Sequence, residues 1–192
     1  YIIMNIVVAA CKNKGIGFKN NLPWKLKNEL NYFKHLTIGN GNNAVIMGKN
    51  TWMEFNKALP KRKNFVLSRK IRKNIGAKNF VFLPSTKYLH FLDNYDDIWV
   101  IGGGQLYTNM INENKIQSIF YTDIQDEFKS DVFFPDISNN FTEIYKSKNY
   151  KEGKTDYCMK VFLNNDIDIR SKISYETQEK ADIALYKAGF EI

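Results

Sequence analysis

The sequence predicts an α/β fold in which a mostly parallel, doubly wound sheet ends in an antiparallel hairpin. Residues 1–124 contain short apolar, β-branched runs separated several times by segments with helical periodicity, an order typical of parallel sheets. Residues 155–163 instead alternate apolar and polar side chains, as in a half-exposed antiparallel strand. The 192 residues, 44% of them apolar, are enough for one domain with a sizeable core.

The first half of the chain opens with residues 2–10, IIMNIVVAA, which are apolar almost throughout and predict a strand buried on both faces. A glycine- and asparagine-rich loop follows over residues 11–23, and helical periodicity begins at Lys25 and continues to about Thr37. The same criteria predict strands at 44–47, 64–67, 80–83, 98–101, 116–124, 141–150 and 155–163, and helices at 51–55, 85–92 and 105–111.

The C-terminal residues 164–192 differ in character from residues 1–163, so we treat the chain as one domain followed by an extension or linker of unknown function. The extension is polar and broken at first. Residues 175–188 predict a short amphipathic helix with Ile183 and Tyr186 facing inward. We expect this extension to be dispensable for chemistry.

Composition excludes several classes of protein. No apolar run approaches the ~20 residues of a membrane span, and the short apolar start lacks the pattern of a signal peptide. Cys11 and Cys158 form neither a disulfide framework nor a CxxC site, which favours a reducing, cytoplasmic setting. With His35 and His90 as the only histidines, no metal site is expected. The net charge of +8 attracts anions, but its lysines are dispersed and no nucleic-acid-binding motif accompanies them.

Glu29 is the first candidate for chemistry. It lies within roughly 40° of the middle of the stripe formed by Leu26, Leu30 and Phe33 on the predicted helix. An acid at the edge of the stripe, reaching water or a neighbouring lysine, is one interpretation. The other is a pocket acid with a raised pKa that binds a heterocycle or supplies a proton. The helix pattern by itself favours neither.

Three loops that follow predicted strands are candidates for binding a phosphorylated ligand. Gly102-Gly103-Gly104 places bare backbone amides before a helix, which suits a diphosphate, although Tyr107 stands where the dinucleotide fingerprint requires glycine. Gly48 to Thr51 and Ser68-Arg69 add cations at the carboxyl ends of strands, where ligands of such sheets bind. Each loop alone is at least as typical of an ordinary turn with solvated charges. Arg62 could bind a carboxylate, but alone it is interpreted as a surface charge.

Taken together, these pieces resemble the dihydrofolate reductase family over residues 2 to about 163. The matching stretches, in order and with the expected gaps, are GIGFKNNLPW (15–24), ELNYF (29–33), VIMGKNTW (45–52), LPKRKNFVLSR (59–69), WVIGGGQLY (99–107), FYTDI (120–124), FFPD (133–136) and YCMKVF (157–162). The resemblance implies a mixed eight-stranded sheet. It also implies NADPH-dependent reduction of 7,8-dihydrofolate to tetrahydrofolate, by hydride transfer to C6 and protonation at N5.

The resemblance also implies roles for particular residues. Glu29, Trp24 and Thr122 are the catalytic group: Glu29 binds the pterin amino group and N3, Thr122 bonds the acid or its water, and Trp24 braces a mobile loop. The substrate pocket comprises Val8, Ala9, Glu29, Phe33, Phe55, Leu59, Arg62, Ile101 and Thr122, with Arg62 on the glutamate tail. The cofactor site comprises Ala9, Ile16, Gly48, Lys49, Asn50, Thr51, Leu67, Ser68, Arg69, Ile101, Gly103, Gly104, Gln105, Leu106 and Tyr107. Gly102-Gly103 matches the family's cis glycine pair.

The same resemblance implies further properties. Antifolates join dihydrofolate as expected ligands, and the protein is expected as a monomer or fused to or associated with thymidylate synthase, within one-carbon metabolism. Gln105 departs from the family by replacing a basic residue that some members use on the cofactor. Three other readings stay open: a related reductase of riboflavin synthesis, which would not need Glu29, a basic nucleic-acid-binding module, and a non-catalytic relative.

Overall fold

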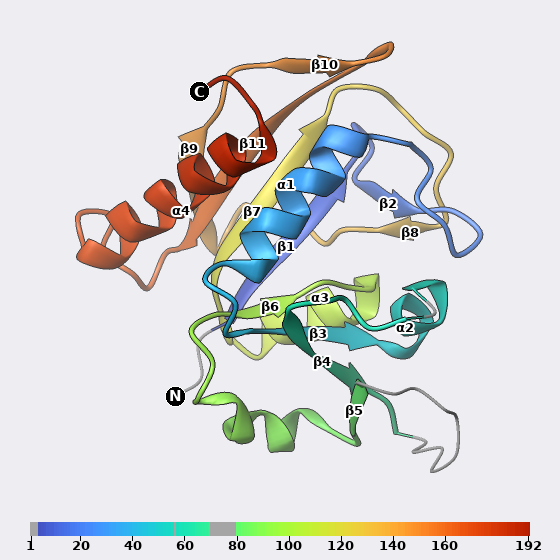
Figure 1. Ribbon diagram of the computed structural model, residues 1–192, viewed down its shortest axis with the longest axis vertical. Helices are drawn as coiled ribbons and strands as arrows, with labels where there is room; N and C mark the ends of the chain where they lie inside the picture. The colour runs from blue at the N-terminus through green and yellow to red at the C-terminus, as the bar shows by residue number, and fades with distance from the viewer. Residues whose placement is uncertain (1–3, 56, 70–79) are drawn as a thin grey trace.

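The computed structural model describes residues 4–55, 57–69 and 80–192 (Figure 1). Its strands are β1 (Met4–Ala10), β2 (Gly15–Gly17), β3 (Asn43–Gly48), β4 (Arg62–Leu67), β5 (Phe80–Leu83), β6 (Ile98–Val100), β7 (Ile116–Ile124), β8 (Val132–Phe133), β9 (Phe141–Lys146), β10 (Tyr150–Glu152) and β11 (Thr155–Asn164). Its helices are α1 (Lys27–Ile38), α2 (Lys49–Phe55), α3 (Gly104–Asn112), α4 (Lys172–Ala188) and the 3₁₀ helix η1 (Thr86–Leu92). The first two residues of the strand expected at 2–10 lie outside the described ranges.

The main sheet is mixed and mostly parallel, as the sequence predicts. Its order is β10-β11-β7-β1-β6-β3-β4-β5, and β9 pairs with β11 next to β10. The pairs from β7 to β5 are parallel, and those that involve β11 are antiparallel. The predicted strand 141–150 is divided into β9 and β10, and Ser147 lies in the interruption. The Ser147 N–H donates to the Met159 carbonyl, and the Ser147 hydroxyl oxygen accepts from the Met159 N–H. Among the described residues the sheet therefore has nine strands, eight of them in the order given above, as expected, and β9 beside β10.

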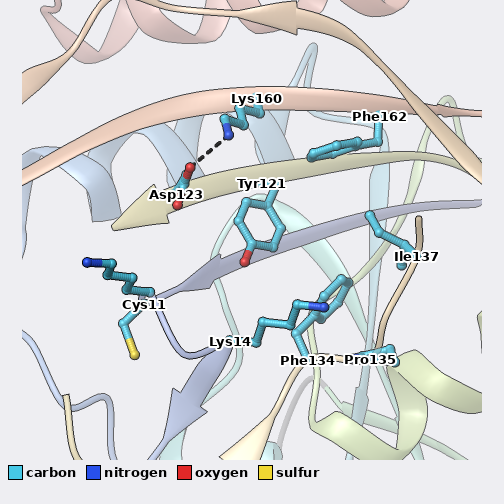
Figure 2. A pocket seen from close by; sticks show the side chains of 10 residues that line it. Cys11, Lys14, Tyr121, Asp123, Phe134, Pro135, Ile137, Lys160 and Phe162 are labelled. Carbon is cyan, nitrogen blue, oxygen red and sulfur yellow. Dashed lines mark ion pairs between the residues drawn. The ribbon is translucent and has the colours of Figure 1, made fainter. Parts of the chain in front are cut away.

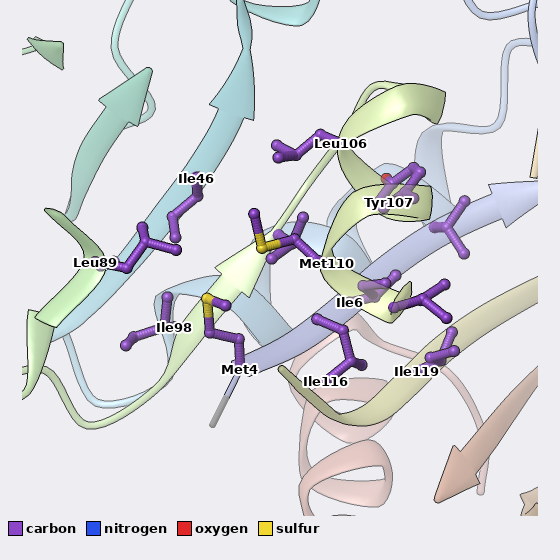
Figure 3. Packing of buried hydrophobic residues seen from close by; sticks show 14 of the residues in the cluster. Met4, Ile6, Ile46, Leu89, Ile98, Leu106, Tyr107, Met110, Ile116 and Ile119 are labelled. Carbon is purple, nitrogen blue, oxygen red and sulfur yellow. The ribbon is translucent and has the colours of Figure 1, made fainter. Parts of the chain in front are cut away.

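One face of the sheet carries a core formed with α3 and η1 (Figure 3). Met4 and Ile6 of β1 pack there with Met110 of α3, and all three are fully buried. Because side chains alternate along a strand, the neighbouring residue Val7 points to the opposite face. The sheet is thus buried on both faces, which explains the continuous apolar runs of its central strands.

The second face is covered by α1 and α4, which lie side by side (Figure 1). Its core includes Trp99 of β6, Tyr32 of α1, and Ala181 and Leu185 of α4, each at most 1% exposed. The C-terminal extension therefore packs into the same core as the strands. Its helix begins at a Ser171 cap, whose hydroxyl accepts from the Ser174 N–H, and ends at Gly189 with φ +88°.

The predicted orientation of the extension helix is wrong. Ile183 is 46% exposed and Tyr186 is 72% exposed, whereas Ala181, Ala184 and Leu185 are buried. The predicted stripe used the large side chains of Ile183 and Tyr186, but the buried face is formed by Ala181, Ala184 and Leu185.

The stripe predicted for α1 is also partly wrong. Leu30 is 48% exposed, and the buried residues of the helix are Glu29, Tyr32, Leu36 and Thr37. Since Tyr32 and Leu36 lie three and seven residues after Glu29, the acid belongs to the buried face itself and not to its edge.

The loop expected at 11–23 contains a short strand. β2 pairs with β8 in a separate two-stranded sheet, which ties the loop to residues after β7. Within the described residues, no helix has the length and apolarity needed to cross a membrane. The same residues contain no cluster of His, Cys, Asp and Glu suited to a metal ion.

Candidate active site

The centre of the candidate site is the contact between Glu29 of α1 and Thr122 of β7. The Thr122 hydroxyl donates to Glu29 Oε1 at 2.9 Å, and the two residues are 1% and 5% exposed, respectively. The strand alternation of β7 turns Thr122 toward α1 and the adjacent Tyr121 toward the other face. The two residues that the sequence places 93 positions apart are thus brought into direct contact.

The environment of Glu29 favours its protonated form. Burial raises the pKa of the carboxyl from 4.5 to about 7, the Thr122 hydrogen bond opposes this rise, and the negative charge of Glu152 adds to it. An acid with a pKa near neutrality can both hold and release a proton at physiological pH. The pocket-acid interpretation of the sequence fits this environment, and the surface-acid interpretation does not.

The sheet face that α1 covers carries an apolar cluster that includes Trp24. Trp24 is 5% exposed and packs edge-on against Phe128 at 5.6 Å between ring centroids. The indole Nε1 of Trp24 is buried and has no hydrogen-bond partner among the described residues. The predicted pocket residues in the cluster are Ala9, Phe33, Phe55, Leu59 and Ile101. The structure therefore places these predicted residues in one apolar cluster on this face of the sheet.

Val8 and Leu30 differ in how they compare with the prediction. The resemblance implies that Val8 acts through its backbone, and its side chain indeed packs into the core of the opposite face. Leu30, which the sequence assigned to the core, is half exposed and lies one turn before Phe33 on α1. The helix pattern alone could not separate this half-exposed residue from the core.

Arg62 is held at the start of β4 beside the end of α1. Its Nη1 donates to the Thr37 hydroxyl at 2.7 Å and its Nε to the Pro60 carbonyl at 3.0 Å. Partial burial lowers the pKa of the guanidinium to about 10, so it remains a cation at neutral pH. No carboxylate pairs with it among the described residues.

The three candidate phosphate loops lie on one edge of the sheet. β6, β3 and β4 are adjacent and parallel, so the segments after their carboxyl ends face the same side. Gly48 pairs with Leu67, and its N–H donates to the Gly102 carbonyl at 2.7 Å. The side chains of Lys49 and Arg69 are exposed and form no ion pair within the described ranges.

The glycine turn has the expected cis peptide between Gly102 and Gly103. Gly102 has φ +119°, and a Cβ there would lie 3.4 Å from the hydroxyl oxygen of Thr51 and 3.3 Å from that of Tyr107. The nine-residue helix α3 follows with Gly103 at its N-cap and no side-chain cap. Its first backbone N–H groups are therefore suited to an anionic ligand.

The remaining predicted cofactor residues differ in how far their side chains are exposed to solvent. Gln105 is exposed, and Asn50 is exposed beside Lys49. Leu106 and Tyr107 are buried, so their side chains contribute to the core, and the Tyr107 hydroxyl donates to the Val7 carbonyl at 2.9 Å. Ile16, Leu67 and Ser68 are half-buried.

A cavity of about 230 Å³ is lined by residues that include Tyr121 and Phe162 (Figure 2), whose side chains pack on the sheet face opposite Thr122. Tyr121, Phe134 and Phe162 line it together with basic residues, and a Lys160–Asp123 ion pair at 2.8 Å closes one side. None of its lining residues belongs to the predicted substrate or cofactor sets. The cavity is separate from the site assembled around Glu29.

Comparison with known proteins gives one family. The dihydrofolate reductase family model matches residues 3–165. Similar proteins include a dihydrofolate reductase of Drosophila melanogaster, 33% identical over 151 residues (73% of this chain and 83% of the relative). One from Gallus gallus is 37% identical over 148 residues, 70% of this chain and 78% of the relative. A viral dihydrofolate reductase of Saimiriine herpesvirus 2 is 35% identical over 163 residues, 78% of this chain and 73% of the relative.

Proposed function

Because this chain belongs to the dihydrofolate reductase family of oxidoreductases, we propose that it reduces 7,8-dihydrofolate to 5,6,7,8-tetrahydrofolate with NADPH. The observation that carries the proposal is the buried Glu29 carboxyl, held by Thr122 and surrounded by apolar and aromatic side chains. A flat heterocycle with an amino group beside a ring nitrogen matches such an acid, because the two carboxyl oxygens can bond both groups at once.

Glu29 has two tasks in this proposal. Its carboxyl orients the pterin through the 2-amino group and N3, and it provides the proton that reaches N5 through a water molecule. A pKa of about 7 leaves the acid partly protonated at physiological pH, which suits proton transfer. Thr122 holds one carboxyl oxygen and so fixes the orientation of the acid.

Trp24 and the loop before it control water in this proposal. The unpartnered indole N–H of Trp24 is a buried donor that a bound water or ligand atom would satisfy. The loop is anchored by hydrogen bonds at its base, where the Asp131 N–H donates to the Gly17 carbonyl and the Phe134 N–H to the Lys14 carbonyl. Closure of this segment over the pterin would exclude bulk water during the reaction.

The rest of the substrate meets the apolar side of α1. We propose that Phe33, Phe55, Leu59 and the half-exposed Leu30 line the aminobenzoyl group. Arg62 would bind the α-carboxylate of the glutamate tail, since its guanidinium is already oriented by Thr37. We expect Lys34 and Lys57 to add positive charge near this carboxylate.

The residues of the β6-β3-β4 edge fit NADPH. The uncapped start of α3 suits the diphosphate, and the exposed Lys49 and Arg69, with Ser68, suit the 2′-phosphate. NADPH, when bound, supplies the hydride that reduces C6 of the pterin. Gly48, Asn50, Thr51, Gly103 and Gly104 would approach it through backbone or small side chains, and Ala9, Ile16, Ile101 and Tyr107 would border the nicotinamide.

The proposed reaction places the enzyme in one-carbon metabolism and thymidylate synthesis, and we expect a cytoplasmic location. Antifolates that mimic the pterin would bind at Glu29. We expect the protein to act as a monomer or in fusion or association with thymidylate synthase, and size-exclusion chromatography distinguishes the monomer from an assembly.

The test is the loss of absorbance at 340 nm when NADPH and dihydrofolate are mixed with the protein. We expect activity in the wild type and a fall of about two or more powers of ten for Glu29→Gln at neutral pH, because a positioned proton donor contributes that much. Glu176→Gln on α4, which pairs with Lys172 at the surface, serves as the control and should keep full activity. A Glu29→Gln enzyme with wild-type activity at neutral pH would contradict the role of the acid.

A further inference from the structure

The helix that carries Glu29 begins without a cap of its own. Leu26 occupies the N-cap position with φ −119° and ψ 95°, and its apolar side chain cannot accept a hydrogen bond. Glu29, the acid of the first turn, points instead to Thr122. The first backbone N–H groups of α1 therefore need an acceptor from elsewhere in the molecule.

Glu152, at the end of β10, supplies that acceptor. Its Oε1 accepts from the Lys27 N–H at 2.5 Å, and its two oxygens accept from the Asn28 N–H at 3.2 and 3.1 Å. A carboxylate at a helix N-terminus also interacts favourably with the helix dipole. The cap thus comes from a residue 125 positions away in sequence.

The capping carboxylate is itself held in place. The Tyr157 hydroxyl of β11 donates to Glu152 Oε2 at 3.2 Å, and Glu152 pairs with Thr155 across the hairpin. Gly153 turns this hairpin with φ +62°. Because β11 also pairs with β7, the sheet that positions Thr122 positions the cap of α1 as well.

We propose that Glu152 is a positioning residue for Glu29: by capping α1 from the β10–β11 hairpin, it fixes the first turn of that helix so that the acid meets Thr122. Glu29 lies one and two residues after the two capped N–H groups, so a frayed first turn would move it directly. This inference rests on the proposed function, since it assigns a role in that reaction.

The charge of Glu152 has a second consequence for the same acid. The groups that interact electrostatically with Glu29 are Glu152, Tyr32, Tyr107 and Tyr157. Burial raises the pKa of each of these three tyrosines, so they are neutral at physiological pH. Glu152 is therefore the negatively charged group among these four. Its charge raises the pKa of Glu29 and so favours the protonated form of that acid.

The first test is a ¹³C NMR titration of the Glu29 carboxyl in the protein without substrate, with Glu29→Gln to identify its resonance. In Glu152→Gln we expect the pKa of Glu29 to fall by roughly half a pH unit, because a nearby like charge is removed. Asp156→Asn is the matched control: it removes a charge from the same hairpin, where Asp156 pairs with the exposed Lys151. An unchanged pKa in Glu152→Gln, or an equal change in Asp156→Asn, overturns the inference.

The second test separates the cap from the charge. We expect faster exchange of the Lys27 and Asn28 amide protons in Glu152→Ala, with partial recovery in Glu152→Gln, whose side-chain oxygen still accepts. We expect kcat to fall about tenfold in Glu152→Ala and to recover partly in Glu152→Gln, with the KM for NADPH unchanged. Equal exchange rates in wild type and Glu152→Ala would overturn the inference.

The two tests also separate this inference from the proposed function. Neither measurement needs turnover: the titration decides whether the charge of Glu152 acts on Glu29, and the exchange decides whether Glu152 caps α1, even if dihydrofolate is not the substrate. A wild type that reduces dihydrofolate while its Glu29 pKa is insensitive to Glu152→Gln would overturn the positioning role and leave the proposed function intact.

Discussion

The Glu29 side of the molecule and the cofactor edge of the sheet are built in opposite ways. Glu29 and Thr122 are buried, hydrogen-bonded to each other and backed by a core to which α1, α4 and six strands contribute buried residues. On the edge after β6, β3 and β4, Lys49, Arg69 and Gln105 are exposed side chains, and the uncapped start of α3 adds backbone donors. The first region is formed by buried, packed side chains, and the second by charged side chains and backbone N–H groups that are exposed to solvent.

This difference follows from what each region is proposed to bind. A proton donor needs a pKa near neutrality, and for Glu29 the largest cause of that pKa is desolvation by a packed environment. A phosphate is bound by cations and free N–H groups, which must stay accessible until the ligand arrives. Changes on the Glu29 side should therefore alter stability together with function, and changes at the edge should alter binding alone.

The largest effect is expected deep on the Glu29 side, at α4. Leu185→Ala should lower the free energy of unfolding by about 2–5 kcal/mol, because Leu185 is fully buried against α1 and the sheet. Ile183→Ala on the same helix, where the side chain is 46% exposed, should cost well under half as much. Urea unfolding measures both, and equal losses would show that α4 does not pack as described. The extension, expected to be dispensable for chemistry, is thus expected to matter for folding.

The next effect concerns the pH dependence of stability. Glu29 has a pKa of about 7 in the folded protein and 4.5 as its reference value, so the unfolded chain releases this proton first as pH rises. The contribution of Glu29 to the free energy of unfolding is fully present below pH 4.5. It is lost as pH rises from there through 7, by about 3 kcal/mol in total. Glu29→Gln should remove this loss. Urea unfolding of both proteins between pH 5 and pH 8 checks it, and parallel pH profiles would contradict a buried, proton-holding acid.

The smallest effect is expected at the exposed edge. Lys49→Ala and Arg69→Ala should each raise the KM for NADPH about tenfold and leave the KM for NADH unchanged, because each removes a charge-assisted contact to the 2′-phosphate. Their free energies of unfolding should stay within about 0.5 kcal/mol of wild type. Lys63→Ala, an exposed lysine near the opposite end of β4, is the control. Steady-state kinetics with both cofactors decides this, and equal use of NADH and NADPH by the wild type would contradict the assignment.

The sequence by itself determined the order of the main sheet's strands and of the helices, the glycine turn after β6 and the acid in the first turn of α1, but not the short strands β2 and β8. The predicted features depend on local patterns: apolar runs, helical periodicity and glycine runs between a strand and a helix. The resemblance added the cis peptide between Gly102 and Gly103 and the pairing of Glu29 with Thr122, and both are present.

Only the tertiary structure decided which apolar residues are buried and what surrounds the acid. Leu30, Ile183 and Tyr186 satisfy a helical stripe yet face outward, because the helix partner, and not hydrophobicity alone, selects the buried face. The cap of α1 by Glu152 joins residues 125 positions apart, so no local pattern could reveal it. The pKa of Glu29 is likewise a property of its surroundings: the sequence supplies the carboxyl, and burial by α1, β7 and their neighbours sets its proton affinity.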